Sequence, residues 1–265
     1  MTRLLITGSS GAIGTTLRHG LAADYAPLRL LDIRPAPDRN EKDEEIIGDL
    51  SDLGVALRAV QNTDTVIHLA GVPREGTWDQ ILPNNIVATY NLFEASRQAG
   101  VKRIIFASTN HVVGYRRADR LVDVGDPVRP DSRYAVSKVF GEALGRLYAD
   151  KHGIDVACLR IGSFRKEPQE HRQLVTWMSP RDMVGLVKAC IEAPSFHFAI
   201  VFGVSGNTRR MWFDDAAHIL KFAPSDNAED FATRLPAPQE ASIASHFHGG
   251  VNCESEFSGD LGAID

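Results

Sequence analysis

The fold of the chain is decided by one stretch near its N-terminus: Arg3-Leu4-Leu5-Ile6-Thr7-Gly8-Ser9-Ser10-Gly11-Ala12-Ile13-Gly14. A short apolar run is followed by three glycines, each three residues from the next, and then by a helical pattern through Leu21. Glycines in a tight strand-to-helix turn leave the backbone bare, so that a diphosphate can reach the N-terminus of the helix. Because any tight turn of this kind needs glycine, the stretch indicates a dinucleotide site only together with other residues.

Short apolar runs and helical patterns alternate along the rest of the chain. Further strands are expected at 28–32, 45–48, 65–69, 103–107, 156–161 and 199–204, and helices at 81–98, 134–149 and 183–193. Strands that are almost entirely apolar are typical of a parallel sheet covered on both faces. The sequence therefore predicts an α/β fold with a doubly wound parallel sheet. We expect residues 1–161 to form a Rossmann domain, and residues 162–265 a small substrate-binding portion interleaved with the same sheet.

Composition and charge exclude several classes of protein. The 265 residues carry a formal net charge of -5 without a long run of like charges, so we expect no nucleic acid partner. No apolar run approaches the ~20 residues of a membrane helix, and the first three residues lead directly into a strand, so we expect neither a membrane partner nor a signal peptide. Cys158, Cys190 and Cys253 are odd in number and far apart, which indicates reduced thiols in the cytoplasm. His246-x-His248 comes nearest to a metal spacing, and we expect no metal.

The run Tyr134-Ala135-Val136-Ser137-Lys138 carries the candidate chemistry. It begins a helical pattern, and positions four apart lie on one face of a helix, so the phenol and the ammonium project into the same space. A free tyrosine has a pKa of about 10, and a cation held beside it lowers that pKa by stabilising the phenolate. We expect Tyr134 to act as a general acid–base if the rest of the chain supplies a reactant. Taken alone, the spacing is more often an exposed helix pair.

Residues at the predicted carboxyl ends of the strands indicate where a dinucleotide binds. Asp32 ends the second strand, about the distance downstream at which a carboxylate accepts hydrogen bonds from an adenosine ribose. A carboxylate there would repel a 2′-phosphate and favours NAD over NADP, whereas Arg34 nearby can accommodate that phosphate. The expected set at the strand ends is Gly8, Gly11, Ala12, Ile13, Gly14, Asp32, Ile33, Arg34, Asp49, Leu50, Leu69, Ala70 and Gly71. For Asp49-Leu50 and Ala70-Gly71, ordinary strand-end loops are an equally good explanation.

With the glycines, Asp32 and the Tyr134–Lys138 pair together, residues 2–220 resemble the short-chain dehydrogenase/reductase superfamily in its extended branch, the NAD-dependent epimerase/dehydratase family. The resemblance implies that a hydroxyl residue after the fifth strand completes the catalytic set. In Thr109-Asn110-His111-Val112-Val113-Gly114, Thr109 matches that residue, and alternation along the strand should turn Ser108 to the other face. It also implies that Asn85, Lys138 and Ser163 lie beside the cofactor.

Four segments are similar to those of the uronate dehydrogenases within that branch: Thr109-Asn110-His111-Val112-Val113-Gly114-Tyr115, Arg129-Pro130-Asp131-Ser132-Arg133-Tyr134-Ala135-Val136-Ser137-Lys138, Arg160-Ile161-Gly162-Ser163 and Arg172-Gln173-Leu174-Val175-Thr176-Trp177. This similarity implies an enzyme that oxidises the anomeric carbon of a hexuronic acid to an aldarolactone with NAD. Tyr134 would take the hydroxyl proton, Lys138 together with the cationic nicotinamide ring would hold the phenolate pKa down, and Thr109 would donate to the reacting oxygen. The implied substrate-binding set is Pro73, Thr109, Asn110, His111, Tyr134, Phe164 and Arg172, with the planar fork of Arg172 matching a carboxylate.

Two segments depart from the uronate dehydrogenase pattern. In Ala70-Gly71-Val72-Pro73-Arg74-Glu75, proline replaces a serine and removes both a hydroxyl and a backbone donor. Residues 164–168, Phe-Arg-Lys-Glu-Pro, replace the usual Cys-x-Pro. A different acidic sugar, or epimerase, dehydratase or reductase chemistry on another substrate, therefore stays open as an alternative. A catalytically idle dinucleotide sensor is a third possibility, against which the intact catalytic set argues.

The last part of the chain is less informative. We expect a homo-oligomer, in which residues 224–265 either wrap an adjacent subunit or are partly mobile. We interpret residues 246–250 as a turn before a last short strand, and we assign no chemistry to it.

Overall fold

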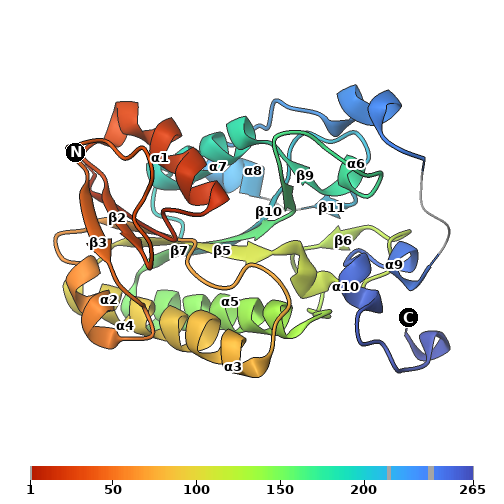
Figure 1. Ribbon diagram of the computed structural model, residues 1–265, viewed down its shortest axis with the longest axis horizontal. Helices are drawn as coiled ribbons and strands as arrows, with labels where there is room; N and C mark the ends of the chain where they lie inside the picture. The colour runs from red at the N-terminus through yellow and green to blue at the C-terminus, as the bar shows by residue number, and fades with distance from the viewer. Residues whose placement is uncertain (1, 214–215, 238–241, 265) are drawn as a thin grey trace.

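The computed structural model describes residues 2–213, 216–237 and 242–264, and a seven-stranded sheet lies at its centre (Figure 1). Its strands are β1 (Leu4–Thr7), β2 (Arg29–Asp32), β3 (Glu44–Ile47), β4 (Thr65–His68), β5 (Arg103–Thr109), β7 (Asp155–Ile161) and β10 (Phe198–Gly203). Their order is β10-β7-β5-β4-β1-β2-β3, and every pair is parallel. The predicted doubly wound parallel sheet is confirmed.

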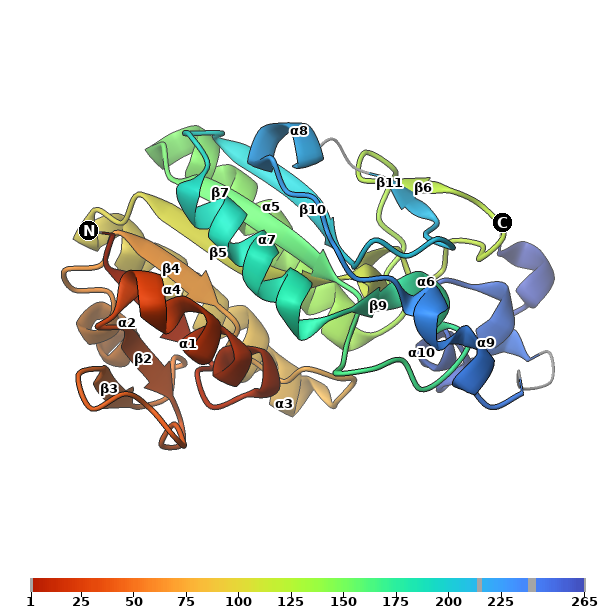
Figure 2. The same cartoon turned by 90° about the horizontal axis from the view of Figure 1, so that it is seen from above.

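Helices cover both faces of this sheet, as Figures 1 and 2 show. α1 (Ala12–Tyr25) and α7 (Pro180–Glu192) pack on one face, and α2 (Leu53–Ala59), α4 (Ala88–Ala99) and α5 (Arg133–His152) on the other. Each face buries its own apolar core against these helices. None of the helices in the described ranges is long and apolar enough to cross a membrane.

Small elements gather beyond the carboxyl ends of the strands (Figures 1 and 2). They are η2 (Asn110–Val113), β6 (Val122–Asp123), β8 (Ser163–Phe164), α6 (Gln173–Thr176), β9 (Trp177–Met178), β11 (Trp212–Phe213), η3 (Ala228–Arg234), α9 (Ile243–His246), α10 (Val251–Glu254) and η4 (Leu261–Ala263). α8 (Ala216–Leu220) instead lies near α7 and β10.

Three local expectations differ from the structure. The helix expected at 81–98 is divided into α3 (Trp78–Ile81), a π-helical turn η1 (Leu82–Val87) and α4, because Pro83 lacks the N–H that a regular helix needs. The short helix α2 was not predicted; the Asp52 side chain accepts from the N–H of Gly54 and caps it. The prediction of a last short strand after residues 246–250 is wrong, because residues 251–254 form the helix α10. Phe247 makes only an isolated bridge to Arg117.

The strand order reverses between β1 and β4, which is where ligands bind in such sheets. Gly8 directly follows β1 with a φ of +69°, and a Cβ there would lie 2.7 Å from the backbone nitrogen of Ala70, which follows β4. A Cβ on Gly14 would lie 2.3 Å from the carbonyl oxygen of Gly8. Only glycine fits these two positions, so the turn keeps its backbone bare at the switch point.

α5 lies unusually close to β5, because a Cβ on Gly141 would lie 2.2 Å from Cζ of Phe106. Gly141→Val should therefore lower the free energy of unfolding by about 1–3 kcal/mol, the usual effect of overpacking a core. Urea denaturation measures the difference. Ala143→Ser, on the exposed face of the same helix, should change it by less than about 0.5 kcal/mol. A Gly141→Val variant as stable as the unchanged protein would contradict this close packing.

Candidate active site

Three predicted residues meet at the carboxyl end of β5. Thr109 ends that strand, and its side chain lies beside the phenol of Tyr134, in the first turn of α5, where it lowers the phenol pKa. Ser108 turns the other way and donates to Glu142 at 2.6 Å. The prediction that Thr109 rather than Ser108 faces Tyr134 is confirmed. Lys138 follows one turn later, with its Nζ 5.7 Å from the centroid of the Tyr134 ring and 5.0 Å from that of Phe106.

Burial dominates the ionisation of this pair. Tyr134 is 9% exposed and Lys138 6%. Burial raises the pKa of Tyr134 to about 12; the neighbouring Thr109 side chain opposes this rise and the Asp131 carboxylate adds to it. Burial likewise lowers the pKa of Lys138 to about 8. Without the cofactor, Lys138 does not bring the pKa of the phenol below its ordinary value, because leaving water disfavours both charged forms.

The catalytic helix is fixed to the loop after β4. Asn85 donates to the Val72 carbonyl at 3.1 Å and to Oγ of Ser137 at 3.0 Å, and accepts from the Val72 N–H at 2.8 Å. In these contacts Asn85, expected beside the cofactor, holds the loop against α5. Glu75 accepts from the N–H of Tyr134 at 3.0 Å. Nothing in the sequence pattern indicated Glu75, because its partner is a backbone group that becomes available only once α5 begins there.

A buried ion pair joins the same helix to the sheet. Glu142 lies one turn after Lys138, and both its oxygens accept from Arg160 on β7, at 3.0 and 2.9 Å. Both side chains are almost fully buried. Removing either partner would leave the other charge buried and unpaired, so the pair fixes how α5 sits on β5 and β7. The spacing Tyr134-Lys138-Glu142 places all three side chains on one helix face. This spacing was the sequence signal for a role of Glu142, although the Glu142–Arg160 pair was not predicted.

The turn after β1 fits the diphosphate of a dinucleotide. α1 begins after Gly11 with no side-chain cap and no acidic residue in its first turn, so its N–H groups are open to an anion. Asp32 accepts from the N–H of Ser10 at 2.9 Å and from that of Arg34 at 3.1 Å, which holds its carboxylate beside this turn. The other predicted residues also lie at strand ends: Ala12 and Ile13 open α1, Ile33 follows β2, Asp49 and Leu50 follow β3, and Leu69, Ala70 and Gly71 follow β4.

Arg172 lies against Asn110, the residue that follows Thr109. With the Asn110 amide nitrogen donating to the Ile161 carbonyl at 3.1 Å, its oxygen accepts from Nη2 of Arg172 at 3.1 Å. Nε and Nη2 of Arg172 also donate to the His248 carbonyl, at 3.1 and 2.6 Å. Nη1 has no hydrogen-bond partner within the described part of the chain, so this nitrogen is left to receive an anionic ligand.

His111 follows Asn110 in η2 and stands between Tyr134 and a carboxylate. Its Nδ1 lies 2.6 Å from Oδ2 of Asp131, whose side chain is fully buried, and its ring meets the Tyr134 ring edge-on at 6.5 Å. With Nδ1 occupied by Asp131, Nε2 is the ring nitrogen that can face a ligand. Asp131 stands in a motif that the sequence analysis quoted without assigning it a role.

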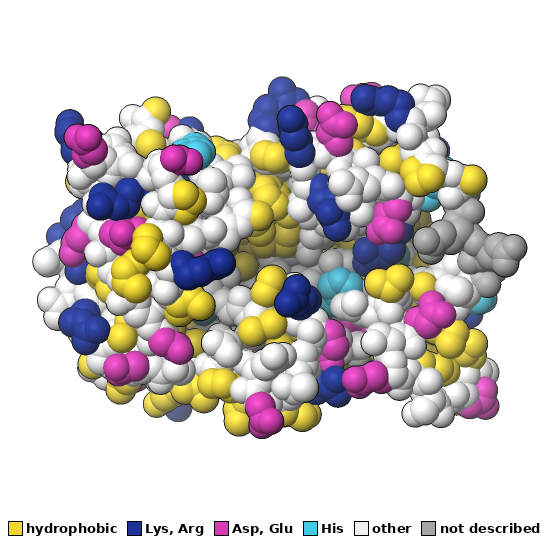
Figure 3. Space-filling view, viewed as in Figure 1, with side chains coloured by type: hydrophobic (Ala, Val, Ile, Leu, Met, Phe, Trp, Pro, Cys, Tyr) yellow, Lys and Arg dark blue, Asp and Glu magenta, His cyan; other side chains and the backbone are white. Residues whose placement is uncertain are grey.

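The remaining predicted residues have separate surroundings. Ser163 bonds Thr176 through its hydroxyl at 2.8 Å, Phe164 packs against the core beneath α1 and α7, and Pro73 is exposed. Figure 3 shows the molecule hollowed near the end of β5, with hydrophobic side chains inside and Lys, Arg and His around it. The structure thus brings Thr109, Asn110, His111, Tyr134 and Arg172 together, whereas Pro73 lies on the loop that Asn85 fastens to α5.

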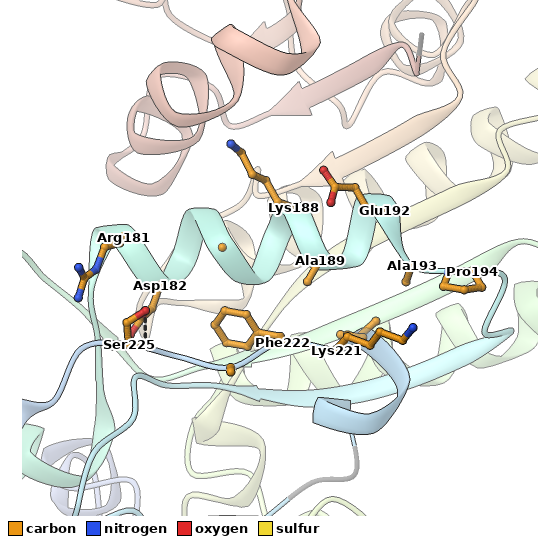
Figure 4. A pocket seen from close by; sticks show the side chains of 13 residues that line it. Arg181, Asp182, Lys188, Ala189, Glu192, Ala193, Pro194, Lys221, Phe222 and Ser225 are labelled. Carbon is orange, nitrogen blue, oxygen red and sulfur yellow. Dashed lines mark hydrogen bonds between the residues drawn. The ribbon is translucent and has the colours of Figure 1, made fainter.

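A separate pocket of about 740 Å³ lies between α7 and residues 220–225 (Figure 4). Lys188, Glu192 and Phe222 line it, and none of the predicted catalytic, cofactor-binding or substrate-binding residues does. Within the described ranges, no group of three or more His, Cys, Asp or Glu side chains is arranged to hold a metal ion. The candidate chemistry therefore belongs to the strand-end site and not to this pocket.

Lys138→Met should stabilise the cofactor-free protein at pH 7. Lys138 makes no hydrogen bond or ion pair with a described residue, and burial lowers its pKa from 10.5 to about 8. Between pH 8 and 10.5 the Lys138 amine is protonated in the unfolded chain but largely neutral in the folded one, so the free energy of unfolding rises with pH across this range. Below about pH 8 the folded protein carries the full cost of burying the ammonium. Thermal melts should show a gain of at most about 3 kcal/mol for Lys138→Met at pH 7, shrinking towards pH 10. A gain independent of pH would contradict this burial of an unpaired ammonium.

Comparison with known proteins agrees with this geometry. A profile of the NAD dependent epimerase/dehydratase family matches residues 4–210. The chain is 40% identical over 255 residues to a uronate dehydrogenase of Pseudomonas putida, and the match covers 94% of each chain. It is 38% identical over 250 residues to an NAD-dependent glucose-6-phosphate dehydrogenase of Haloferax volcanii, covering 86% of this chain and 95% of that protein.

Among solved structures, that of a mutant uronate dehydrogenase from Agrobacterium tumefaciens complexed with NAD aligns with a TM-score of 0.92. It is 38% identical in sequence, and the alignment covers 96% of this chain and 98% of that chain. A family profile over most of the chain, a full-length relative and a shared fold all point the same way. The chain belongs to the NAD-dependent epimerase/dehydratase family.

Proposed function

We propose that the protein oxidises the anomeric carbon of a hexuronic acid to an aldarolactone, with NAD as cofactor. The observation that carries the proposal is the grouping of Thr109 and Tyr134, with Lys138 one turn away, His111 against the Tyr134 ring, and Arg172 on Asn110. This arrangement has a proton acceptor at one end and an anion-binding cation at the other, as a cyclic uronic acid requires. The similarity to uronate dehydrogenases over nearly the whole chain supports it.

Each residue has a distinct role in the proposed reaction. NAD, when bound, supplies the acceptor for the hydride that leaves the anomeric carbon. Tyr134 takes the proton of the anomeric hydroxyl, so that the carbon–oxygen single bond becomes the carbonyl of the lactone. Thr109 donates to the reacting oxygen and keeps it beside the phenol. Lys138 supplies a positive charge on the same helix face, which favours the phenolate once a bound reactant excludes water.

The other half of the site selects the substrate. Nη1 of Arg172 binds the carboxylate, and Asn110 and His111 bind ring hydroxyls. We further propose that residues 162–265 supply the substrate-binding portion, because Arg172 and the chain that contacts it both lie there. A cytoplasmic location is part of the same proposal, supported by three buried, unpaired cysteines.

A second candidate is oxidation of another anionic sugar. Pro73 and Arg74 are both exposed, and Arg74 adds a positive charge to the loop that Asn85 fastens beside Tyr134. A relative named as an NAD-dependent glucose-6-phosphate dehydrogenase fits this alternative. NADH absorbance on adding glucuronate, galacturonate, glucose 6-phosphate or neutral sugars separates the two. Turnover of the phosphate but of no uronate would reject the first candidate.

Tyr134→Phe should lower kcat by about 10²-fold or more, the contribution of a positioned acid–base group. Binding of NAD, followed by calorimetry, should change by less than about 2-fold, since the ring and its packing remain. Thr109→Ser and Thr109→Val form a matched pair. Thr109→Ser keeps the hydroxyl and should retain most of the activity, whereas Thr109→Val lacks the hydroxyl and should lose activity. Full activity of Tyr134→Phe would exclude Tyr134 as the base, and loss of both activity and NAD binding would mean that its role is in the fold.

We propose that the chain forms a homo-oligomer through the face of α4 and α5. Val87, Tyr90, Val136 and Leu147 are exposed there, although α4 and α5 pack side by side. Light scattering should give a multiple of 29.0 kDa. Tyr90→Glu together with Leu147→Glu should lower that multiple, because burying the two new carboxylates is unfavourable. A mass of 29.0 kDa for the unchanged chain would contradict the proposal.

A further inference from the structure

The turn His248-Gly249-Gly250 packs against both charged groups at the substrate end of the site. The His248 carbonyl accepts from Nε and Nη2 of Arg172. A Cβ on Gly250 would lie 2.7 Å from Nε of Arg172, and a Cβ on Gly249 would lie 2.0 Å from Oδ2 of Asp131. Two neighbouring glycines therefore allow one backbone segment to approach a half-buried cation and a buried anion at once.

This turn is held firmly to the chain that follows the site residues. Gly249 donates through its N–H to the Gly114 carbonyl at 2.9 Å, and His248 donates in the same way to the Arg116 carbonyl at 2.9 Å. Phe247 pairs with Arg117 in an antiparallel bridge. Figures 1 and 2 place α9 and α10, on either side of the turn, at the end of the molecule that holds α6 and β6. The C-terminal segment thus forms part of the wall of its own site.

The contact decides which donors of Arg172 are left for a ligand. A guanidinium has five N–H groups in a rigid plane. The His248 carbonyl takes the edge formed by Nε and Nη2, and the Asn110 oxygen takes Nη2 from the other side. What remains is Nη1, which has no hydrogen-bond partner within the described residues. The turn therefore sets both the plane of the fork and the edge that it presents.

Gly250 has backbone angles that other residues rarely adopt. Its φ is +62° and its ψ is -134°. Any side chain here is strained and also meets Arg172. A change at this position should therefore move the guanidinium, whereas it touches neither Tyr134 nor the glycine turn after β1.

We propose that the His248–Gly250 turn is a positioning element that holds Arg172 so that Nη1 receives the substrate carboxylate. This inference rests on the proposed function, since it assigns a partner to the same site. It makes selectivity for an anionic sugar depend on a C-terminal turn outside the helices and strands that carry the catalytic residues. Within the turn it is Gly250 that meets Arg172, and its nearest neighbours do not include Thr109 or Tyr134, which recognise the anomeric end.

Gly250→Ala tests the proposal. KM for the uronate should rise by roughly 10-fold or more, as when a charge-assisted hydrogen bond is lost, while kcat and the KM for NAD should change by less than about 2-fold. Gly259→Ala is the matched control, because a Cβ there meets only Phe257 at an ordinary 3.5 Å. In an Arg172→Ala background, Gly250→Ala should raise KM no further, since the turn acts through Arg172.

The outcomes separate this proposal from the function on which it rests. An unchanged protein that oxidises no uronate overturns both. The positioning role alone is overturned if Gly250→Ala has the KM of the unchanged protein. It is also overturned if Gly250→Ala raises KM by the same factor in the Arg172→Ala background as in the unchanged protein. If Gly250→Ala does not fold, a crystal structure of the unchanged protein with bound uronate decides. The proposal requires the carboxylate on Nη1 with the His248 carbonyl still on Nε and Nη2, and a carboxylate that displaces this carbonyl overturns it.

Discussion

Burial of a phenol and an ammonium on one face of α5 is the constraint on which the rest of the site depends. Removal from water raises the pKa of Tyr134 and lowers that of Lys138, so neither side chain is poised for proton transfer by itself. The surroundings keep this unfavourable arrangement in place. Gly141 lets α5 approach Phe106, and the Glu142–Arg160 pair fastens the helix to β5 and β7. In the proposed reaction, bound NAD would bring a positive charge close to the phenol and favour its ionised form.

The site is divided between two parts of the chain with different tasks. The switch point between β1 and β4 provides a bare backbone and the Asp32 carboxylate, which suit a dinucleotide. The small elements beyond the strands provide Arg172, Asn110 and the His111–Asp131 pair, which suit an anionic sugar. Thr109 and Tyr134 lie where the two parts meet. In the proposed function, the catalytic end of the site would be fixed by the sheet, whereas the carboxylate end would depend on loops and on the C-terminal turn.

Features set by local sequence were predictable, and those set by contacts between distant segments were not. Alternating apolar runs with Gly8 and Gly14 specified the parallel sheet and its turn, and alternation along β5 correctly turned Ser108 away from Tyr134. Glu75 and Asp131 act through partners that only the folded chain brings near, so no spacing indicated them. The raised pKa of Tyr134 in the protein without cofactor could not be predicted from the Tyr134–Lys138 spacing, because it comes mainly from burial, and burial depends on packing between distant segments. Residues 246–250 showed no periodicity, although they contact Arg172 directly.

Burial raises the pKa of Tyr134 and so keeps its phenol protonated until NAD binds. The most direct measurement is a titration of tyrosinate absorbance for the unchanged protein minus Tyr134→Phe, with and without NAD. Without NAD, Tyr134 should titrate with a pKa of about 12, and bound NAD should lower this pKa. A Tyr134 that titrates at the ordinary tyrosine value without NAD, or at the same pH with and without NAD, would contradict this expectation.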